Sequence, residues 1–135
     1  MRIALDFSVL IAPHISRAGA CAELLEDLLL HHELVISEFI LKELSRKLSE
    51  KFDFPQRDAN HVAAFLRSVG IVVLPADLPS NLCRDPTDLP VLGTAVAGEC
   101  ASLISVDRDL LDMQKIHENP IIRPGEYWRQ TNVID

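Results

Sequence analysis

The chain has 135 residues, of which 48% are hydrophobic and 5% aromatic, and its 20 acidic and 13 basic residues give a formal charge of −7. This length predicts one domain, residues 1–135, with a core built mainly from Leu, Val, Ile and Ala. The acidic balance argues against a passive DNA-coating protein, which would present a basic surface, but a nuclease stays open because several acids could be metal ligands.

The cysteines and the apolar runs predict a soluble, cytoplasmic protein. Cys21, Cys83 and Cys100 are widely spaced and form no C-x-x-C pair, so neither a disulfide framework nor a zinc site is expected. Asp6 interrupts the first apolar run, so we expect no signal peptide. The apolar runs are shorter than the ~20 residues that cross a bilayer, and no membrane association is expected.

The predicted elements alternate between strands and helices. The first half of the chain predicts a strand at 2–6, a turn near Pro13 and Gly19, a helix at 20–31, a strand at 33–36, a helix capped by Ser37 that runs to 52, and a helix at 55–68. The second half predicts a strand at 71–74, a loop at 75–84, a helix starting over 85–88, a strand at 102–106, a helix capped by Asp107 that runs to 113, a strand at 121–122 and a helical turn from Pro124. This alternation indicates an α/β fold with a mainly parallel sheet covered on both faces.

Four carboxylates stand where such a fold would bring them together: Asp6, Glu43, Asp88 and Asp107. Asp6 and Asp107 each follow an apolar strand directly, and parallel α/β sheets bind their ligands at the carboxyl ends of strands. Clustered carboxylates repel one another, and proteins usually hold them for hard cations such as Mg²⁺ or Mn²⁺. The hypothesis is therefore metal-assisted phosphodiester hydrolysis.

The strand-end acids also have structural interpretations. Asp6 could be the N-cap of residues 7–10, although a charge directly after a buried strand is costly unless it is paired or bound to metal. Asp107 could be satisfied by Arg108 or by a helix N-terminus, and Asp109 is an alternative to it. Both interpretations stay open.

The two helical acids are weaker candidates by local pattern. Asp88 is ambiguous with Asp85, and taken alone a first-turn Asp favours ordinary helix stabilisation. Glu43 lies off the stripe of leucines on its predicted helix, among charged residues, as a solvated face does. An active-site cleft is also solvent-facing, so this position neither supports nor refutes a catalytic role.

Five segments nevertheless resemble the motifs of one family, in order and with compatible spacing. They are IALDFSVLI at 3–11, VISEFILKEL at 35–44, DPTDLPVLGTA at 85–95, LISVDRDLL at 103–111 and IIRPGEY at 121–127. Together they resemble a PIN domain, and specifically the PIN toxins of bacterial and archaeal toxin–antitoxin pairs. The resemblance implies a three-layer α/β/α sandwich and a Mg²⁺- or Mn²⁺-dependent endoribonuclease.

The resemblance also implies site residues and partners. Metal-site and catalytic roles fall on the four acids already named, and supporting roles fall on Ser105, Asp109 and Asp85. The implied partners are an RNA substrate and a small antitoxin protein that covers the acidic site. The amphipathic helices between residues 20 and 52 could bind that antitoxin or form a homodimer, although a leucine stripe is more often core. The basic residues considered for phosphate contacts are Arg17, Lys42, Arg46, Lys47, Arg84 and Arg108.

Three positions depart from the family pattern. Phe7 replaces the small hydroxyl residue usual after the first Asp, Val106 stands where Gly is common and Cys100 where Ala is common. Ser8 could supply a hydroxyl, but its side chain is expected to point elsewhere. Phe7 therefore keeps open a catalytically impaired module that acts through protein or RNA binding. A phosphatase of another α/β family fits less well, because Ser8 stands where a dehalogenase-type motif needs Asp.

Overall fold

The computed structural model describes residues 1–15 and 19–132. The strands are β1 (Arg2–Leu5), β2 (Glu33–Ile36), β3 (Ile71–Val72), β4 (Ser102–Ile104), β5 (Lys115–Ile116) and β6 (Asn119–Ile122). The helices are α1 (Phe7–Ile15), α2 (Ala20–His31), α3 (Glu38–Phe52), α4 (Gln56–Val69), α5 (Leu89–Ala97), α6 (Arg108–Met113) and α7 (Pro124–Asn132), and the short 3₁₀ turn η1 (Pro86–Asp88) precedes α5.

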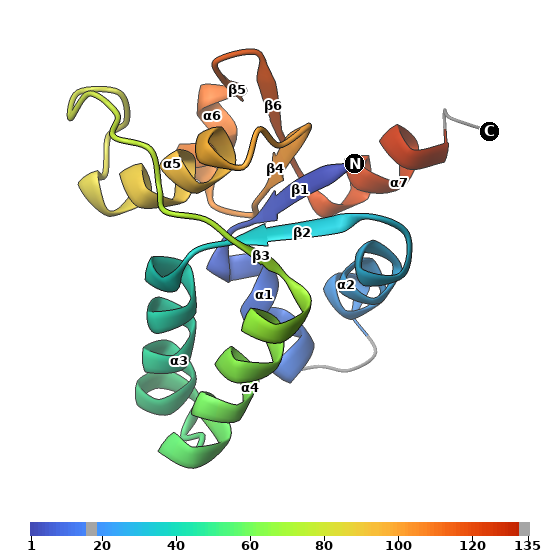
Figure 1. Cartoon of the computed structure of the whole chain (residues 1–135), viewed down its shortest axis with the longest axis vertical. Coiled ribbons are helices and arrows are strands. Elements are labelled where there is room, and N and C mark those ends of the chain that lie inside the picture. The colour runs from blue at the N-terminus through green and yellow to red at the C-terminus, as the bar shows by residue number, and fades with distance from the viewer. Residues whose placement is uncertain (16–18, 133–135) are drawn as a thin grey trace.

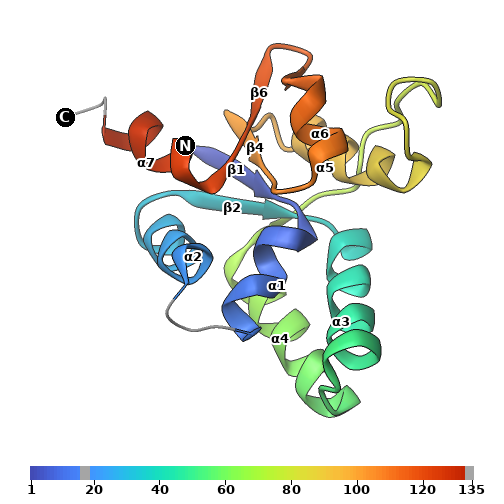
Figure 2. The ribbon, with the colours of Figure 1, turned by 180° about the vertical axis from the view of Figure 1, so that it is seen from behind.

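Over the described residues the strands form one sheet in the order β3-β2-β1-β4-β6-β5. Every neighbouring pair is parallel except β5 and β6, which form an antiparallel hairpin. Helices α1 to α4 lie on one side of β1 and β2, and α5 and α6 lie on the other (Figures 1 and 2). The predicted α/β fold with a mainly parallel sheet between helical layers is confirmed.

The strand register brings the ends of β1 and β4 to the same edge of the sheet. Leu5 lies beside Ile104, and the N–H of Asp6 continues the ladder by donating to the Ile104 carbonyl at 3.0 Å. Ser105 then follows β4 just as Asp6 follows β1. The carboxyl ends of parallel strands are where such sheets bind ligands, so this edge positions the candidate site.

The leucine stripes of α2 and α3 pack into the core. Their buried members are Leu24, Leu25, Leu28, Leu41, Leu44 and Leu48. Helix α2 packs against α1, α7 and β2, and α3 packs against α1, α4 and α5, so both bury their apolar faces as an amphipathic helix on a globular core does. No helix in the described part of the chain is both long and apolar enough to cross a membrane.

Several element boundaries differ from the sequence prediction. The expected turn near Pro13 is wrong, because that residue lies inside α1, whose side chains Val9 and Leu10 are buried. The third and fourth strands end at Val72 and Ile104, two residues earlier than expected at each. Strand β5 was not predicted, since a two-residue strand has no alternation to read. The terminal helical turn is a nine-residue helix, α7.

Candidate metal centre

Asp6 lies at the carboxyl end of β1, where its carboxylate is almost completely buried. The residue is 1% exposed, and Oδ2 accepts hydrogen bonds from Ser105 Oγ at 2.8 Å and from Ser8 Oγ at 2.9 Å. The other oxygen, Oδ1, is buried and has no hydrogen-bond partner among the described residues. Burying an unpaired carboxylate oxygen costs free energy because it loses its hydration. This oxygen is therefore the first candidate ligand for a cation.

Ser8 supplies the hydroxyl that Phe7 lacks. The expectation that the Ser8 side chain points away from the acid is wrong, because Ser8 lies in the first turn of a helix that begins directly after Asp6. The Asp6 carbonyl accepts hydrogen bonds from the N–H groups of Val9 and Leu10 at 3.0 and 3.2 Å, as a residue at a helix start does. Asp6 thus starts α1 with its backbone while its side chain faces the site.

Asp85 and Asp88 differ in their surroundings, although the sequence left open which of them stabilises the helix start and which is a candidate metal ligand. Asp85 is exposed and caps η1, since its Oδ1 accepts hydrogen bonds from the N–H and hydroxyl of Thr87 at 3.0 and 2.9 Å. Asp88 is 5% exposed, its side chain makes no capping bond to α5, and its Oδ2 has no partner in the described chain. Asp88 stands at the N-cap position of α5 without a capping hydrogen bond from its side chain, whereas Asp85 caps η1 through its side chain. Stabilisation of this helix start by the Asp88 charge therefore stays an alternative.

Ser105 joins Asp6 to Asp107. Besides donating to Asp6, the Ser105 hydroxyl accepts a hydrogen bond from the backbone N–H of Asp107 at 2.9 Å. The half-buried Asp107 caps α6, because its Oδ1 accepts from the N–H of Asp109 at 3.1 Å. Asp109 forms an ion pair with the exposed Arg84 at 3.5 Å. Asp107 therefore combines a capping role with a place beside Asp6, whereas Asp109 has a basic partner.

The acids lie close enough to raise one another's proton affinity. The pKa of Asp88 rises to about 7, first through burial and then through the negative charges of Asp107, Asp85, Asp6 and Asp109. Burial also raises the pKa of Asp6; the two hydroxyl donors lower it in part and the charge of Asp107 raises it again. The charges of Asp6, Asp88 and Asp107, three of the four predicted ligands, thus act on one another.

Glu43, the fourth predicted ligand, lies on α3. It is half-buried, and its Oε2 pairs with Arg46 Nη2 at 2.9 Å. One turn later, Lys47 places its ammonium 4.1 Å from the centroid of the Phe7 ring, and Phe7 follows Asp6 directly. Residues four apart share a helix face, so Glu43 and Lys47 both lie on the side of α3 that faces the start of α1.

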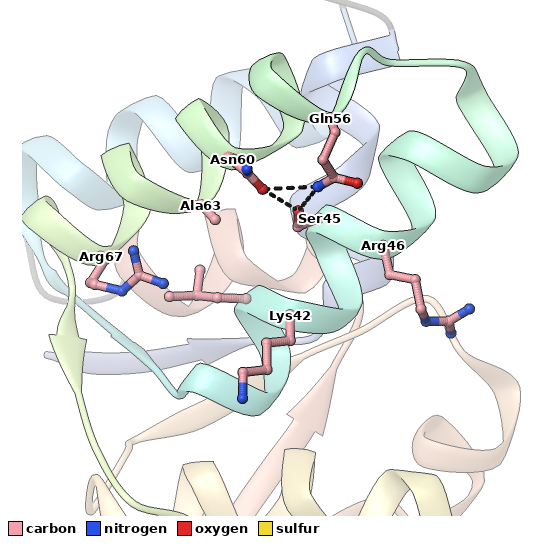
Figure 3. A pocket seen from close by; sticks show the side chains of 8 residues that line it. Lys42, Ser45, Arg46, Gln56, Asn60, Ala63 and Arg67 are labelled. Atoms are coloured by element: carbon pink, nitrogen blue, oxygen red, sulfur yellow. Dashed lines mark hydrogen bonds between the residues drawn. The ribbon is translucent and has the colours of Figure 1, made fainter.

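The remaining basic candidates have different surroundings. Arg46 and Arg84 form ion pairs with acids, Lys42 and Arg108 are exposed, and Arg17 lies outside the described residues. A separate hollow of about 340 Å³ lies between α3 and α4 (Figure 3). Hydrogen bonds connect the Ser45, Gln56 and Asn60 side chains on its wall, and Lys42, Arg46 and Arg67 lie around it. Both arginines pair with glutamates, so these two charges already have partners, unlike the buried oxygens of Asp6 and Asp88.

Two residues that support the site were missed from the sequence. Thr94 is fully buried on α5, with Oγ1 2.8 Å from Ser37 Oγ and 2.7 Å from the Pro90 carbonyl, and it ties α5 to the start of α3. A Cβ on Gly93 would lie 2.4 Å from the carbonyl of Ala76, so only glycine permits this close packing of α5. A threonine within an apolar helix is a signal that could have identified Thr94.

The donor chemistry fits a hard divalent cation. Over residues 1–15 and 19–132, no three His, Cys, Asp or Glu side chains lie close enough together to hold an ion as they stand. The grouped donors are nevertheless carboxylate oxygens, two of them buried without a partner on Asp6 and Asp88. Mg²⁺ and Mn²⁺ prefer such oxygen ligands, and a cation would remove the repulsion between the acids.

A family model described as PIN domain matches residues 2–109. The chain belongs to the PIN domain family. The matched segment contains all four predicted acids, and the β5–β6 hairpin and α7 follow it. The family resemblance predicted from the sequence motifs is confirmed. A comparison with curated proteins gives no significant match.

Solved structures share the PIN fold of this chain. One is VapBC2 from Rickettsia felis bound to a DNA fragment from its promoter, at 14% identity and a TM-score of 0.65, covering 91% of this chain and 98% of that chain. Another is VapBC-1 from nontypeable Haemophilus influenzae, at 18% identity and a TM-score of 0.63, covering 93% of this chain and 99% of that chain. At these identities the likeness shows the fold.

Proposed function

We propose that this PIN-domain chain is a divalent-metal-dependent endoribonuclease that acts in the cytoplasm as the toxin of a toxin–antitoxin pair. The observation that carries the proposal is the pair of buried oxygens, Asp6 Oδ1 and Asp88 Oδ2, without partners among the described residues. Carboxylates held only for structure have their buried oxygens hydrogen-bonded. Two such oxygens in one acidic group are expected where a cation completes the site.

Four acids would hold the Mg²⁺ or Mn²⁺: Asp6, Glu43, Asp88 and Asp107. A bound divalent ion lowers the pKa of a water molecule and neutralises charge on a phosphodiester. The hydroxyls of Ser8 and Ser105 orient the Asp6 carboxylate and favour its charged form, because both donate to Oδ2. Asp85 acts in support by capping η1, and Asp109 by its ion pair with Arg84.

The proposal extends to the partner and to the whole chain. The VapBC complexes that share the fold support a small antitoxin partner, and an acidic site favours a basic segment of that partner. We propose that residues 1–135 act as one PIN domain, which also forms a homodimer. Co-purification with the product of an adjacent short gene, and the mass of the purified chain in solution, test these two points.

RNA cleavage tests the activity. The purified chain with Mn²⁺ should cleave members of a broad panel of transcripts, Asp6→Asn should leave them intact, and EDTA should abolish cleavage by the wild type. Ser102→Ala, which changes a buried hydroxyl outside the cluster, should cleave like the wild type. If the wild type cleaves no RNA that Asp6→Asn leaves intact, the chain is instead a PIN module that acts through binding, and the ribonuclease proposal is wrong.

A further inference from the structure

Lys47 is held on an aromatic face beside the acid cluster. Its ammonium lies 4.1 Å from the centroid of the Phe7 ring, in the contact between α3 and α1. A cation at this distance over a ring is attracted by the negative face of the π system. The contact therefore restrains a long, flexible side chain whose ammonium would otherwise sample many positions.

The charge of Lys47 is not used by neighbouring acids. Arg46, Arg67 and Arg84 each pair with a carboxylate, whereas no carboxylate oxygen of the described residues lies within 4.0 Å of the Lys47 ammonium. The ammonium is thus available to an external anion.

The Phe7 ring links the Lys47 ammonium to the acids. Phe7 follows Asp6 directly in the sequence, and the ammonium lies 4.1 Å from the ring centroid. A single strand carries one phosphate per nucleotide. A strand whose reacting phosphodiester lies at the acids therefore presents a neighbouring phosphate towards the surface around the Phe7 ring.

We propose that Lys47, positioned by the Phe7 ring, binds the backbone phosphate next to the one at the acid cluster. The inference rests on the proposed ribonuclease function and names a contact of that same site. It also explains the aromatic residue at position 7, because Ser8 supplies the hydroxyl to Asp6 and leaves position 7 free to support the lysine.

RNA binding without cleavage tests the contact directly. The fluorescence anisotropy of a labelled, unstructured single-stranded RNA is measured with EDTA present, over a series of salt concentrations. Lys47→Gln should weaken binding several-fold and make the slope of log K against log salt shallower by about 0.7, the value for one phosphate contact on a single strand. Lys51→Gln is the matched control, since Lys51 is exposed one turn further along α3 and should leave both quantities unchanged.

The role of the ring is tested by two substitutions at one position. Phe7→Tyr keeps a π face and should bind RNA like the wild type, whereas Phe7→Leu keeps apolar volume without a π face and should weaken binding about two- to threefold. Thermal unfolding of both variants shows that they fold. Equal RNA affinity of Phe7→Leu and Phe7→Tyr would overturn the positioning role of the ring.

Failure of this inference can be distinguished from failure of the ribonuclease proposal. If Lys47→Gln loses RNA affinity but no variant and no wild-type sample cleaves RNA with Mn²⁺, the contact stands and the ribonuclease proposal is wrong. If the wild type cleaves and Lys47→Gln matches Lys51→Gln in affinity, salt slope and KM, the contact is overturned. Absence of RNA binding by the wild type also overturns it. A raised KM with unchanged kcat in Lys47→Gln supports it.

Discussion

The hydroxyl of Ser105 donates a 2.8 Å hydrogen bond to Oδ2 of Asp6, from the end of β4 to the end of the neighbouring parallel strand β1. The same Ser105 oxygen accepts the backbone N–H of Asp107 at 2.9 Å. One buried hydroxyl therefore fixes two of the proposed ligands. The relationship follows from the register, which places Leu5 beside Ile104 and ends both strands at the same level.

Ser105→Ala should reduce Mn²⁺-dependent RNA cleavage by about tenfold or more and destabilise the fold by about 1 kcal/mol. The reason is that Asp6 loses a donor and the N–H of Asp107 loses its acceptor. Cleavage rates and urea unfolding measure the two effects. Ser102→Ala is the matched control, because Ser102 is equally buried at the start of β4 and its hydroxyl has no hydrogen-bond partner in the described chain. Equal behaviour of the two variants would show that the Ser105 bonds do not matter.

Ser8→Ala should also lower cleavage, but by less, roughly two- to fivefold. The Ser8 hydroxyl donates to Asp6 at 2.9 Å from a half-buried position, where water can replace it, whereas Ser105 is fully buried. Parallel kinetics of the two alanine variants give the comparison. A larger effect at Ser8 than at Ser105 would contradict this ranking.

Asp88 makes the stability of the metal-free protein depend on pH. Its pKa is 3.8 ordinarily and about 7 in the fold, so between these values the folded state keeps a proton that the unfolded state has released. The free energy of unfolding must therefore fall as the pH rises from about 4 to 7. Asp88→Asn removes this effect, and its free energy of unfolding should decline less over the same window, by on the order of 2 kcal/mol. Urea titrations in EDTA at several pH values measure it.

Asp85→Asn should give the opposite pH behaviour. Hydrogen bonds from the N–H and hydroxyl of Thr87 lower the pKa of Asp85, so its stabilising effect is present above its ordinary pKa and is lost as the pH falls below it. Removing the Asp85 charge should therefore destabilise the protein at neutral pH, while removing the Asp88 charge stabilises it. Urea titrations at pH 7 compare the free energies of unfolding of the two variants with that of the wild type. A stabilised Asp85→Asn would contradict the assignment of Asp85 as a cap.

Tyr127→Phe should destabilise the protein by roughly 1–3 kcal/mol, the range for a hydrogen bond to a charged group. The buried Tyr127 hydroxyl lies 2.5 Å from Asp27 Oδ2 and connects α7 to α2. Urea unfolding of the variant measures the loss. An unchanged midpoint would show that α7 contributes little to the fold, and would weaken the proposal that the whole chain forms one domain.

The sequence predicts the frame of the site because that frame depends on regular patterns. Buried runs ending in an acid predict the ends of β1 and β4, and the register then brings Asp6 and Asp107 together. Helix α1 was missed because Pro13 reads as a turn, whereas the helix accommodates it beyond the buried Val9 and Leu10. Hydrophobic periodicity in the sequence cannot show that burial of these side chains in the core stabilises a helix that contains a proline.

Side-chain direction is the part that local pattern could not predict. Asp85 and Asp88 have the same residue type in the same turn, and only packing decides that one caps and the other is buried. The orientation of Ser8 depends on a helix that starts directly after Asp6. Local pattern could not predict the direction of the Glu43 side chain either. Its ion pair with Arg46 lies within α3, and its role at the metal site stays a prediction.

Calorimetric titration with Mn²⁺ tests the central claim, that the unpartnered oxygens of Asp6 and Asp88 are ligands of a divalent cation. The wild type at pH 7.5, a value chosen to lie above the pKa of about 7 for Asp88, should bind Mn²⁺. Asp88→Asn and Asp6→Asn should each lose at least tenfold in affinity, and Ser102→Ala, which changes a buried hydroxyl outside the cluster, should bind like the wild type. Absence of Mn²⁺ binding by the wild type, or equal binding by all four proteins, would contradict the claim.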